Sequence, residues 1–166
     1  MTGAKQSECV FCLVAATVPT AEPLPKGTDE SPHTSGDPLI VCAGRLAYVI
    51  LNRYPYNNGH LMVVPHRHVG SLAALSSEEM MEVGMLTQRS ETALTEAYGP
   101  QGINVGINLG KAAGAGVLDH LHVHVVPRWT GDTNFMTVVG ETRVLPESLD
   151  ASAQRLRPIF ARLISQ

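Results

Sequence analysis

The sequence predicts an α+β domain: an antiparallel sheet with one long helix and a C-terminal helix. Expected strands outnumber expected helices and follow one another along the chain, while a single long helical pattern lies in its middle. Successive strands with helices set apart are typical of an α+β domain on an antiparallel sheet. The 166 residues, 44% of them hydrophobic, suffice for a sizeable core and favour a single domain over residues 1–166.

The N-terminal half predicts a loop followed by a hairpin. Residues 17–38 contain five prolines among glycines and polar residues, so we expect a flexible surface loop and assign it no role. The aliphatic runs 39–51 and 60–65 are expected to be two strands, with the segment from Tyr54 to Gly59 as their turn. Cys42 lies in the first run and is expected to be a small buried hydrophobic residue.

The long helix is predicted after the hairpin. Ser76 and Glu79 have the spacing of a capping box, and apolar residues then recur at helical intervals until Gly99 and Pro100 end the pattern. In residues 103–107, apolar side chains alternate with Asn and Gly. This alternation predicts a half-buried strand.

The C-terminal extension, residues 130–166, carries weaker patterns. We expect a further strand over 138–145 and a final helix after Pro146. Pro158 lies inside that helical pattern and should bend or interrupt it, because proline lacks the backbone N–H that an internal helix position donates.

Charge and composition narrow the class of protein. The net charge is −3, and there is no cluster of lysine or arginine of the kind that a dedicated nucleic-acid binder carries. No apolar stretch is long enough to span a bilayer, and Met1–Glu8 lacks the layout of a signal peptide. We therefore expect a cytoplasmic protein that binds neither nucleic acid nor a membrane, and nothing in the sequence calls for an organic cofactor.

Three histidines at alternate positions are the strongest chemical signal. On a strand, a period of two places His120, His122 and His124 on one face. One such histidine is most often a packing residue, but three in register point to chemistry. A zinc site of three imidazoles and a water is one interpretation. A central nucleophile with flanking helpers is the other, and the alternation favours it.

Two further segments have a chemical interpretation. Cys9 and Cys12 form a CxxC motif, which indicates half of a zinc site, a redox pair or chance; a disulfide is the least expected in the cytoplasm. The Gly- and Ala-rich loop 109–119 leads directly into the histidines. Its backbone N–H groups can approach phosphate oxygens, and Lys111 offers a countercharge. Turns use glycine more often than ligand sites do, so the loop's position gives the prediction its weight.

The run HLHVHVV from His120, continued by Pro127 and Arg128, resembles the signature of the histidine triad superfamily of nucleotide hydrolases and transferases. The resemblance continues upstream in NNGHLMVVPHRH, residues 57–68, and covers about residues 9–129. It implies a histidine-triad-like fold, a homodimer in which two sheets join, and a small-molecule nucleotide as substrate.

The resemblance also implies catalytic roles. His122 matches the nucleophile, with one ring nitrogen donating to a carbonyl and the other attacking the α-phosphorus. His124 would bind phosphoryl oxygens or assist the leaving group, and His60 would orient the centre from behind. Substrate contacts would come from Asn108, Lys111, Gly114, Ala115, Gly116 and His124.

Relatives with an N-terminal CxxC complete a zinc site with two histidines. The matching residues here are Cys9, Cys12, His68 and His120. Four protein ligands would make a closed tetrahedral site, so the expected zinc is structural.

The expected activity is cleavage of dinucleoside polyphosphates such as diadenosine tetraphosphate at the α-phosphate, through a nucleotidyl-histidine, with phosphate or water as acceptor. The tail after Trp129 resembles bacterial diadenosine polyphosphate hydrolases or phosphorylases, with Asn134–Met136 at the nucleotide site or the dimer contact. Hydrolysis of a phosphoramidate or nucleotidyl sulfate is an alternative, weakened because Gly116 and Val117 stand where relatives carry a hydroxyl. A nucleotide-binding module with little turnover is another. Leu39, Ile40 and Leu51 are the residues expected around the base.

Overall fold

The computed structural model describes residues 9–18, 36–114, 116–117, 119–132 and 147–165. Its helices are α2 (Val10–Ala15), α3 (Ser77–Tyr98) and α5 (Leu149–Ile164), with short 3₁₀ turns η1 (Leu72–Ala74) and η2 (Lys111–Ala113). Its strands are β1 (Ile40–Ala43), β2 (Ala47–Leu51), β3 (Leu61–Pro65), β4 (Gly102–Ile107) and β5 (Val123–Arg128). The predicted strand 138–145, Asn134–Met136, Ala115 and most of the predicted loop 17–38 lie outside the described residues.

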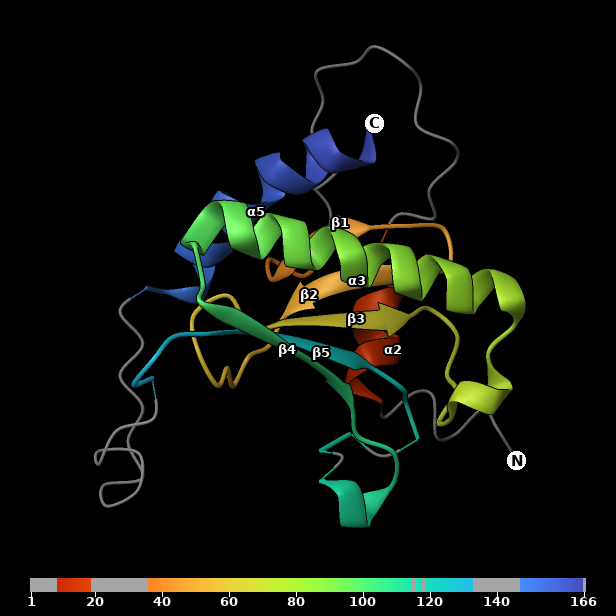
Figure 1. The fold of residues 1–166 in the computed structure, drawn as a ribbon. Helices are drawn as coiled ribbons and strands as arrows, with labels where there is room; N and C mark the ends of the chain where they lie inside the picture. Colours follow the sequence, from red (N-terminus) through yellow and green to blue (C-terminus); the bar gives the residue numbers. More distant parts are fainter. Residues whose placement is uncertain (1–8, 19–35, 115, 118, 133–146, 166) are drawn as a thin grey trace.

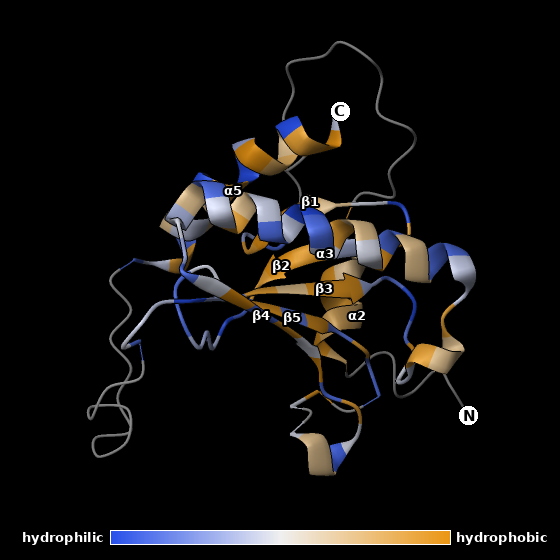
Figure 2. Cartoon of the chain, viewed as in Figure 1, coloured by the Kyte–Doolittle hydropathy of each residue, from blue (hydrophilic) through white to orange (hydrophobic). Residues whose placement is uncertain are grey.

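The strands form one antiparallel sheet in the order β1-β2-β3-β5-β4, which confirms the predicted α+β class. Helices α3 and α5 cover one face, and α2 lies on the opposite face (Figure 1). Strands β2 and β3 are buried at every position and show almost continuous hydrophobic colours, whereas α3 alternates hydrophilic and hydrophobic residues (Figure 2). Central strands covered on both faces need such apolar runs.

The predicted hairpin is present, but its first strand is divided. The run 39–51 breaks after Ala43 and resumes at Ala47, so that β1 and β2 are themselves a hairpin. Glu82 of α3 stabilises the break: its carboxylate accepts hydrogen bonds from the backbone N–H groups of Leu46 (2.7 Å) and Ala47 (3.1 Å). A Cβ on Gly44 would lie 2.3 Å from the same carboxylate oxygen, so the contact requires glycine.

Helix α3 begins and ends as predicted. The Ser76 hydroxyl accepts from the Glu79 backbone N–H, and the Glu79 carboxylate accepts in return from the Ser76 backbone N–H. Gly99 ends the helix in the left-handed conformation, with φ 53°. Arg67 donates to both carboxylate oxygens of Glu79, and chiefly this interaction lowers the pKa of Glu79 to about 2.

Helix α5 and the start of the predicted loop correct two further expectations. Pro158 neither ends nor divides α5, which continues to Ile164. The predicted loop is packed at its start, because Val18 is buried in the core. Cys42 is fully buried, as expected.

The strand carrying the histidines and the edge strand also differ from expectation. β5 starts at Val123, so only His124 lies within it, while His120 and His122 precede it. Strand β4 is an edge strand whose central Val105 is 54% exposed, although the alternation predicted that side to be buried. Within the described part of the chain, no helix combines the length and apolar character needed to cross a membrane.

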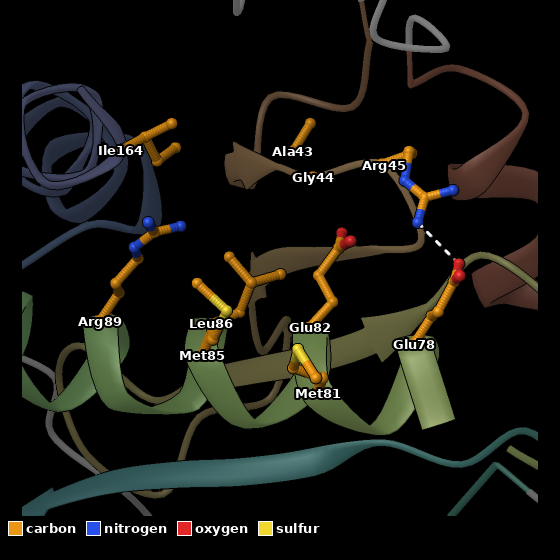
Figure 3. A pocket seen from close by; sticks show the side chains of 10 residues that line it. All are labelled: Ala43, Gly44, Arg45, Glu78, Met81, Glu82, Met85, Leu86, Arg89 and Ile164. Carbon is orange, nitrogen blue, oxygen red and sulfur yellow. Dashed lines mark hydrogen bonds and ion pairs between the residues drawn. The ribbon is translucent and has the colours of Figure 1, made fainter. Parts of the chain in front are cut away.

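Substitution of Glu82 tests whether the stability of the β1–β2 turn depends on its contact with α3. Figure 3 shows Glu82 pointing from α3 toward Gly44, one helical turn from Glu78, which reaches outward to Arg45. We expect Glu82→Ala to lower the free energy of unfolding by about 2 kcal/mol, because two backbone donors lose their acceptor. Glu78→Ala is the matched control and should change it little, since the Arg45–Glu78 pair is exposed. Equal effects of the two changes in urea unfolding would contradict this role.

Candidate active site and metal cluster

A cavity of about 500 Å³ lies on the face of the sheet that carries α2. Its apolar part combines α2 with the central strands, and its polar part comes from the histidines and the loop before them. On β5, His124 pairs with Met62 of β3, which brings both side chains to this face. The lining residues are Val10, Phe11, Val14, Asp37, Leu39, Ile50, Leu51, Asn52, Arg53, Tyr54, Tyr56, Met62, Asn108, Gly114, Gly116, Val117, His122 and His124.

The tautomer of His122 is fixed by its main-chain neighbour. Nδ1 lies 2.9 Å from the carbonyl oxygen of His120, which can only accept, so Nδ1 carries the proton and donates. Burial lowers the pKa of the His122 ring, and the hydrogen bond to His120 only partly opposes it. The ring is therefore neutral at pH 7, with an unprotonated Nε2. A neutral imidazole with one lone pair has the chemistry of a nucleophile.

His124 acquires the opposite tautomer from a relay that starts at Tyr56. The backbone N–H of Tyr56 donates to Nδ1 of His60 (3.1 Å), so the proton of a neutral His60 is on Nε2. That Nε2 lies 3.0 Å from Nδ1 of His124 and donates to it. Burial, reinforced by nearby His122, lowers the pKa of His124 to about 4. His124 is therefore neutral at pH 7 and presents Nε2–H as a hydrogen-bond donor.

The two cavity histidines thus carry their protons on different ring nitrogens although they lie two residues apart. Their ring centroids are 4.7 Å apart, at an interplanar angle of 74°. His122 offers a lone pair and His124 offers an N–H group. His60 is fully buried behind His124 and is absent from the cavity lining. Its Nε2 lies against His124, a more specific position than the sequence indicated.

The glycine-rich loop reaches the cavity with some of its predicted residues. Asn108, Gly114 and Gly116 line the cavity, and Gly114 has a positive φ of 83°, which glycine adopts without strain. Lys111 is exposed on η2 and is not part of the lining, so the structure does not place the predicted countercharge at the site. The expected base contacts Leu39 and Leu51 line the cavity, whereas Ile40 does not.

Cys9, Cys12, His68 and His120 form a cluster next to the cavity. One ligand atom from each lies within 4.8 Å of the others. Nδ1 of His120 is 3.3 Å from Sγ of Cys9, and Nδ1 of His68 is 3.2 Å from Sγ of Cys12. Sulfur and nitrogen ligands of tetrahedral zinc stand about 3.5 Å apart, so the donor set fits this metal.

The hydrogen bonds and burial of the cluster also suit a cation. Nε2 of His120 donates to the carbonyl oxygen of Pro65 (2.9 Å), which leaves Nδ1 as a lone pair directed at the sulfurs. Burial and then the neighbouring Cys9 raise the pKa of Cys12 to about 11. A thiolate at this position needs a positive charge beside it, which a bound divalent metal would provide.

Helix α2 connects the cluster with the cavity, and the sequence did not indicate it. Between the two cysteines, Phe11 contacts the rings of His120 and His122, with centroid distances of 5.4 and 5.0 Å. The buried Tyr48 hydroxyl donates to the backbone carbonyl of Phe11 (3.0 Å) and attaches the helix to β2. The motif VFCLVA is apolar on every side and only six residues long, so its helical character depends on tertiary contacts.

Other cavity residues were also missed, for an identifiable reason. Asn52, Arg53, Tyr54 and Tyr56 lie in or beside the predicted turn, and Asp37 lies in the predicted loop. Polar and aromatic residues in turns have no periodicity that distinguishes a ligand contact from an exposed side chain. The Tyr-Pro-Tyr sequence was the available signal, because two aromatic residues in a turn are unusual in a chain with 5% aromatic residues.

The chain is similar to known proteins in sequence and in fold. The chain is 43% identical over 143 residues to AP-4-A phosphorylase of Mycobacterium tuberculosis, covering 86% of this chain and 73% of that protein. It is 30% identical over 122 residues to bis(5'-adenosyl)-triphosphatase of Dictyostelium discoideum, covering 69% and 80%. A zinc-bound histidine triad family protein from Mycobacterium smegmatis has a similar structure, with a TM-score of 0.69, 26% identity and coverage of 96% and 98%. The sequence model of the HIT (histidine triad) domain family matches residues 36–131. The chain therefore belongs to the HIT domain family.

Proposed function

We propose that this protein cleaves dinucleoside polyphosphates, with diadenosine tetraphosphate as the representative substrate, by transfer of a nucleotidyl group through His122 to inorganic phosphate. The observation that carries the proposal is the opposite tautomers of two neutral histidines in one cavity. An attacking lone pair and a hydrogen-bond donor are what displacement at a phosphorus atom requires. The 43% identical relative named AP-4-A phosphorylase supports phosphate as the acceptor.

The first half-reaction uses His122 as nucleophile. Its Nε2 attacks the α-phosphorus, and the bond from that phosphorus to the bridging oxygen breaks. The Nδ1–H···O=C bond to His120 stabilises the positive charge that develops on the ring. His124 donates Nε2–H to an oxygen of the transferred phosphoryl group or of the leaving group. With diadenosine tetraphosphate, ATP departs and an adenylyl-His122 remains.

The second half-reaction regenerates the histidine. An oxygen of inorganic phosphate attacks the same phosphorus, the N–P bond breaks and ADP is released. ATP and ADP together account for every atom of diadenosine tetraphosphate and phosphate. Asn108 and the loop around Gly114 are proposed to hold phosphoryl oxygens, because they line the cavity beside both histidines. The apolar part around Phe11, Ile50 and Met62 is proposed to receive the adenine.

The other activities considered from the sequence have less support. Gly116 and Val117 line the cavity where a hydroxyl would assist a phosphoramidate substrate, and neither carries one. A binding module without turnover would not need an imidazole in the tautomer suited to attack. The fixed Nε2 lone pair of His122 therefore favours catalysis over binding alone.

Product analysis and a change at His122 test the acceptor and the nucleophile together. Purified protein with diadenosine tetraphosphate and phosphate should form ADP and ATP in equal amounts, as measured by chromatography. His122→Ala should reduce turnover by more than about a thousandfold, because the change removes the attacking lone pair. His66→Gln is the matched control: that ring lies outside the cavity and contacts the carbonyl oxygen of Gly44. AMP with ATP formed equally without phosphate would identify water as the acceptor, and an active His122→Ala protein would exclude covalent catalysis by this residue.

We propose that Cys9, Cys12, His68 and His120 bind one zinc ion. With four protein ligands the ion has no open position for water, so its contribution would be structural. A zinc ion bound by these residues would join α2 to His68, which follows β3, and to His120, which precedes β5. Because Phe11 lies between the cysteines, holding α2 also holds one wall of the cavity.

Elemental analysis should find about one zinc per chain. Cys12→Ala should lose the metal, and a chelator should lower the melting temperature of the unmodified protein by about 5 °C or more, because ligand binding to the folded state stabilises it. Cys42→Ala is the control and should retain the metal, since Cys42 is buried in β1. Protein that contains no zinc and melts unchanged with a chelator would refute the metal site.

We propose that the protein is a homodimer joined through β4. The strand is at the edge of the sheet, and its central Val105 is exposed on the side that α3 covers elsewhere. Met80 of α3 is also exposed, and Gly84, one turn further along, has no heavy atom within 4 Å of an added Cβ. An edge strand with an apolar side chain favours pairing with a second strand.

Val105→Lys tests this interface. A charge at the centre of β4 should convert the dimer to a monomer in light-scattering measurements, because burying an unpaired ammonium is costly. Met81→Lys, on another side of α3, should leave the mass unchanged. A monomeric unmodified protein would exclude the proposed interface.

A further inference from the structure

Two tyrosines stand at the rim of the catalytic cavity. Tyr54 and Tyr56 both line it, yet their exposed fractions are 82% and 52%. Tyr54 is the most exposed large hydrophobic residue in the described part of the chain. An aromatic ring so exposed contributes little to the core. Packing therefore does not explain why this tyrosine lies at the cavity.

The backbone holds both rings in place. Pro55, between them, is buried, and its ring restricts both its own φ and the conformation of Tyr54 before it. The backbone N–H of Tyr54 donates to the Asn52 side chain (2.9 Å), and that of Tyr56 donates to His60. The Tyr56 ring also stacks on His60, with centroids 4.8 Å apart at 24°. A ligand would therefore meet a rim that is already ordered, which reduces the entropic cost of binding.

The rim lies on the polar side of the reacting centre. The Tyr56 ring centroid is 6.4 Å from that of His124, the residue that donates toward the phosphoryl group or leaving group. Phe11 is 5.0 Å from His122 and belongs to the apolar part. Aromatic or apolar surface is thus present next to each of the two cavity histidines.

We propose that Tyr54, with Tyr56 beside it, forms a stacking subsite for the base of the departing nucleotide. This inference rests on the proposed function: one base occupies the apolar part near Phe11, and the base at the other end of the polyphosphate stacks on the rim. Arg53, adjacent to Tyr54, supplies a guanidinium at the same rim, where it lies 3.5 Å from Asp37. The subsite takes an aromatic base by its face, which every nucleobase offers.

The subsite predicts a preference for dinucleotides over mononucleotides with the same phosphate chain. Adenosine 5′-tetraphosphate is the matched probe, because it presents the same α-phosphate and lacks the second adenosine. The unmodified protein should favour diadenosine tetraphosphate in kcat/KM by about tenfold, after allowance for its two equivalent ends, since stacking on one aromatic residue has about this effect. Tyr54→Ala should remove most of that preference, and Tyr54→Trp should preserve it.

Tyr54 is the position to change, because Tyr56 also supports His60 and its loss would disturb His124. Met81→Ala, an exposed apolar residue outside this cavity, is the control and should preserve the ratio. No preference in the unmodified protein, or a parallel loss for both nucleotides in Tyr54→Ala, would overturn the subsite while the proposed activity stands.

Binding measurements separate the two proposals. Both nucleotides are titrated by calorimetry into His122→Ala protein, with and without Tyr54→Ala. Tighter binding of the dinucleotide that disappears with Tyr54→Ala supports the subsite, even where the unmodified protein cleaves neither nucleotide and the proposed function has failed. Equal binding of both nucleotides overturns the subsite.

Discussion

His120 is the residue on which both parts of the site depend. Its ring donates from Nε2 to the Pro65 carbonyl oxygen and directs Nδ1 toward the two cysteine sulfurs. Its own carbonyl oxygen accepts from Nδ1 of His122 and thereby fixes the nitrogen that can attack. One backbone position therefore sets the geometry of the metal cluster and the tautomer of the candidate nucleophile. The backbone N–H of Leu121, which donates to Val69 (2.6 Å), holds the segment between these two histidines.

Burial keeps both His122 and His124 neutral, and hydrogen bonding then places the proton on a different ring nitrogen in each. Desolvation lowers the pKa of both His122 and His124, so neither ring is cationic near neutral pH. A carbonyl acceptor fixes one tautomer, and a donated N–H from His60 fixes the other. A sheet face alone would not produce this difference, because alternate residues on a strand have similar surroundings. The difference comes from the turn at Tyr56 and from the segment before β5.

Local patterns in the sequence predicted much of the fold and the identity of the main histidines. The capping box at Ser76 and the stop at Gly99 are patterns of neighbouring residues, and both were found in the structure. The alternating histidines brought His122 and His124 to one cavity, although only His124 lies on the strand and His120 belongs to the cysteine cluster. Contacts between distant segments were not predictable in the same way. The division of 39–51 into two strands depends on Glu82, which lies more than thirty residues further on. Helix α2 depends on Tyr48 and on the cysteine cluster, and Lys111 was misplaced because composition does not determine where a loop side chain points.

The order of groups along the cavity links the chemistry to the choice of substrate. His122, the candidate nucleophile, lies beside an apolar wall formed by α2, β2 and β3, while His124 lies beside the exposed rim. Tyr56 belongs to both, because its backbone N–H starts the relay to His124 and its ring forms part of the rim. A nucleotide that contacts the rim would therefore touch the same turn that fixes the tautomer of His124. The proposed recognition of the outer base and the orientation of His124 thus depend on one short segment, held by a buried proline.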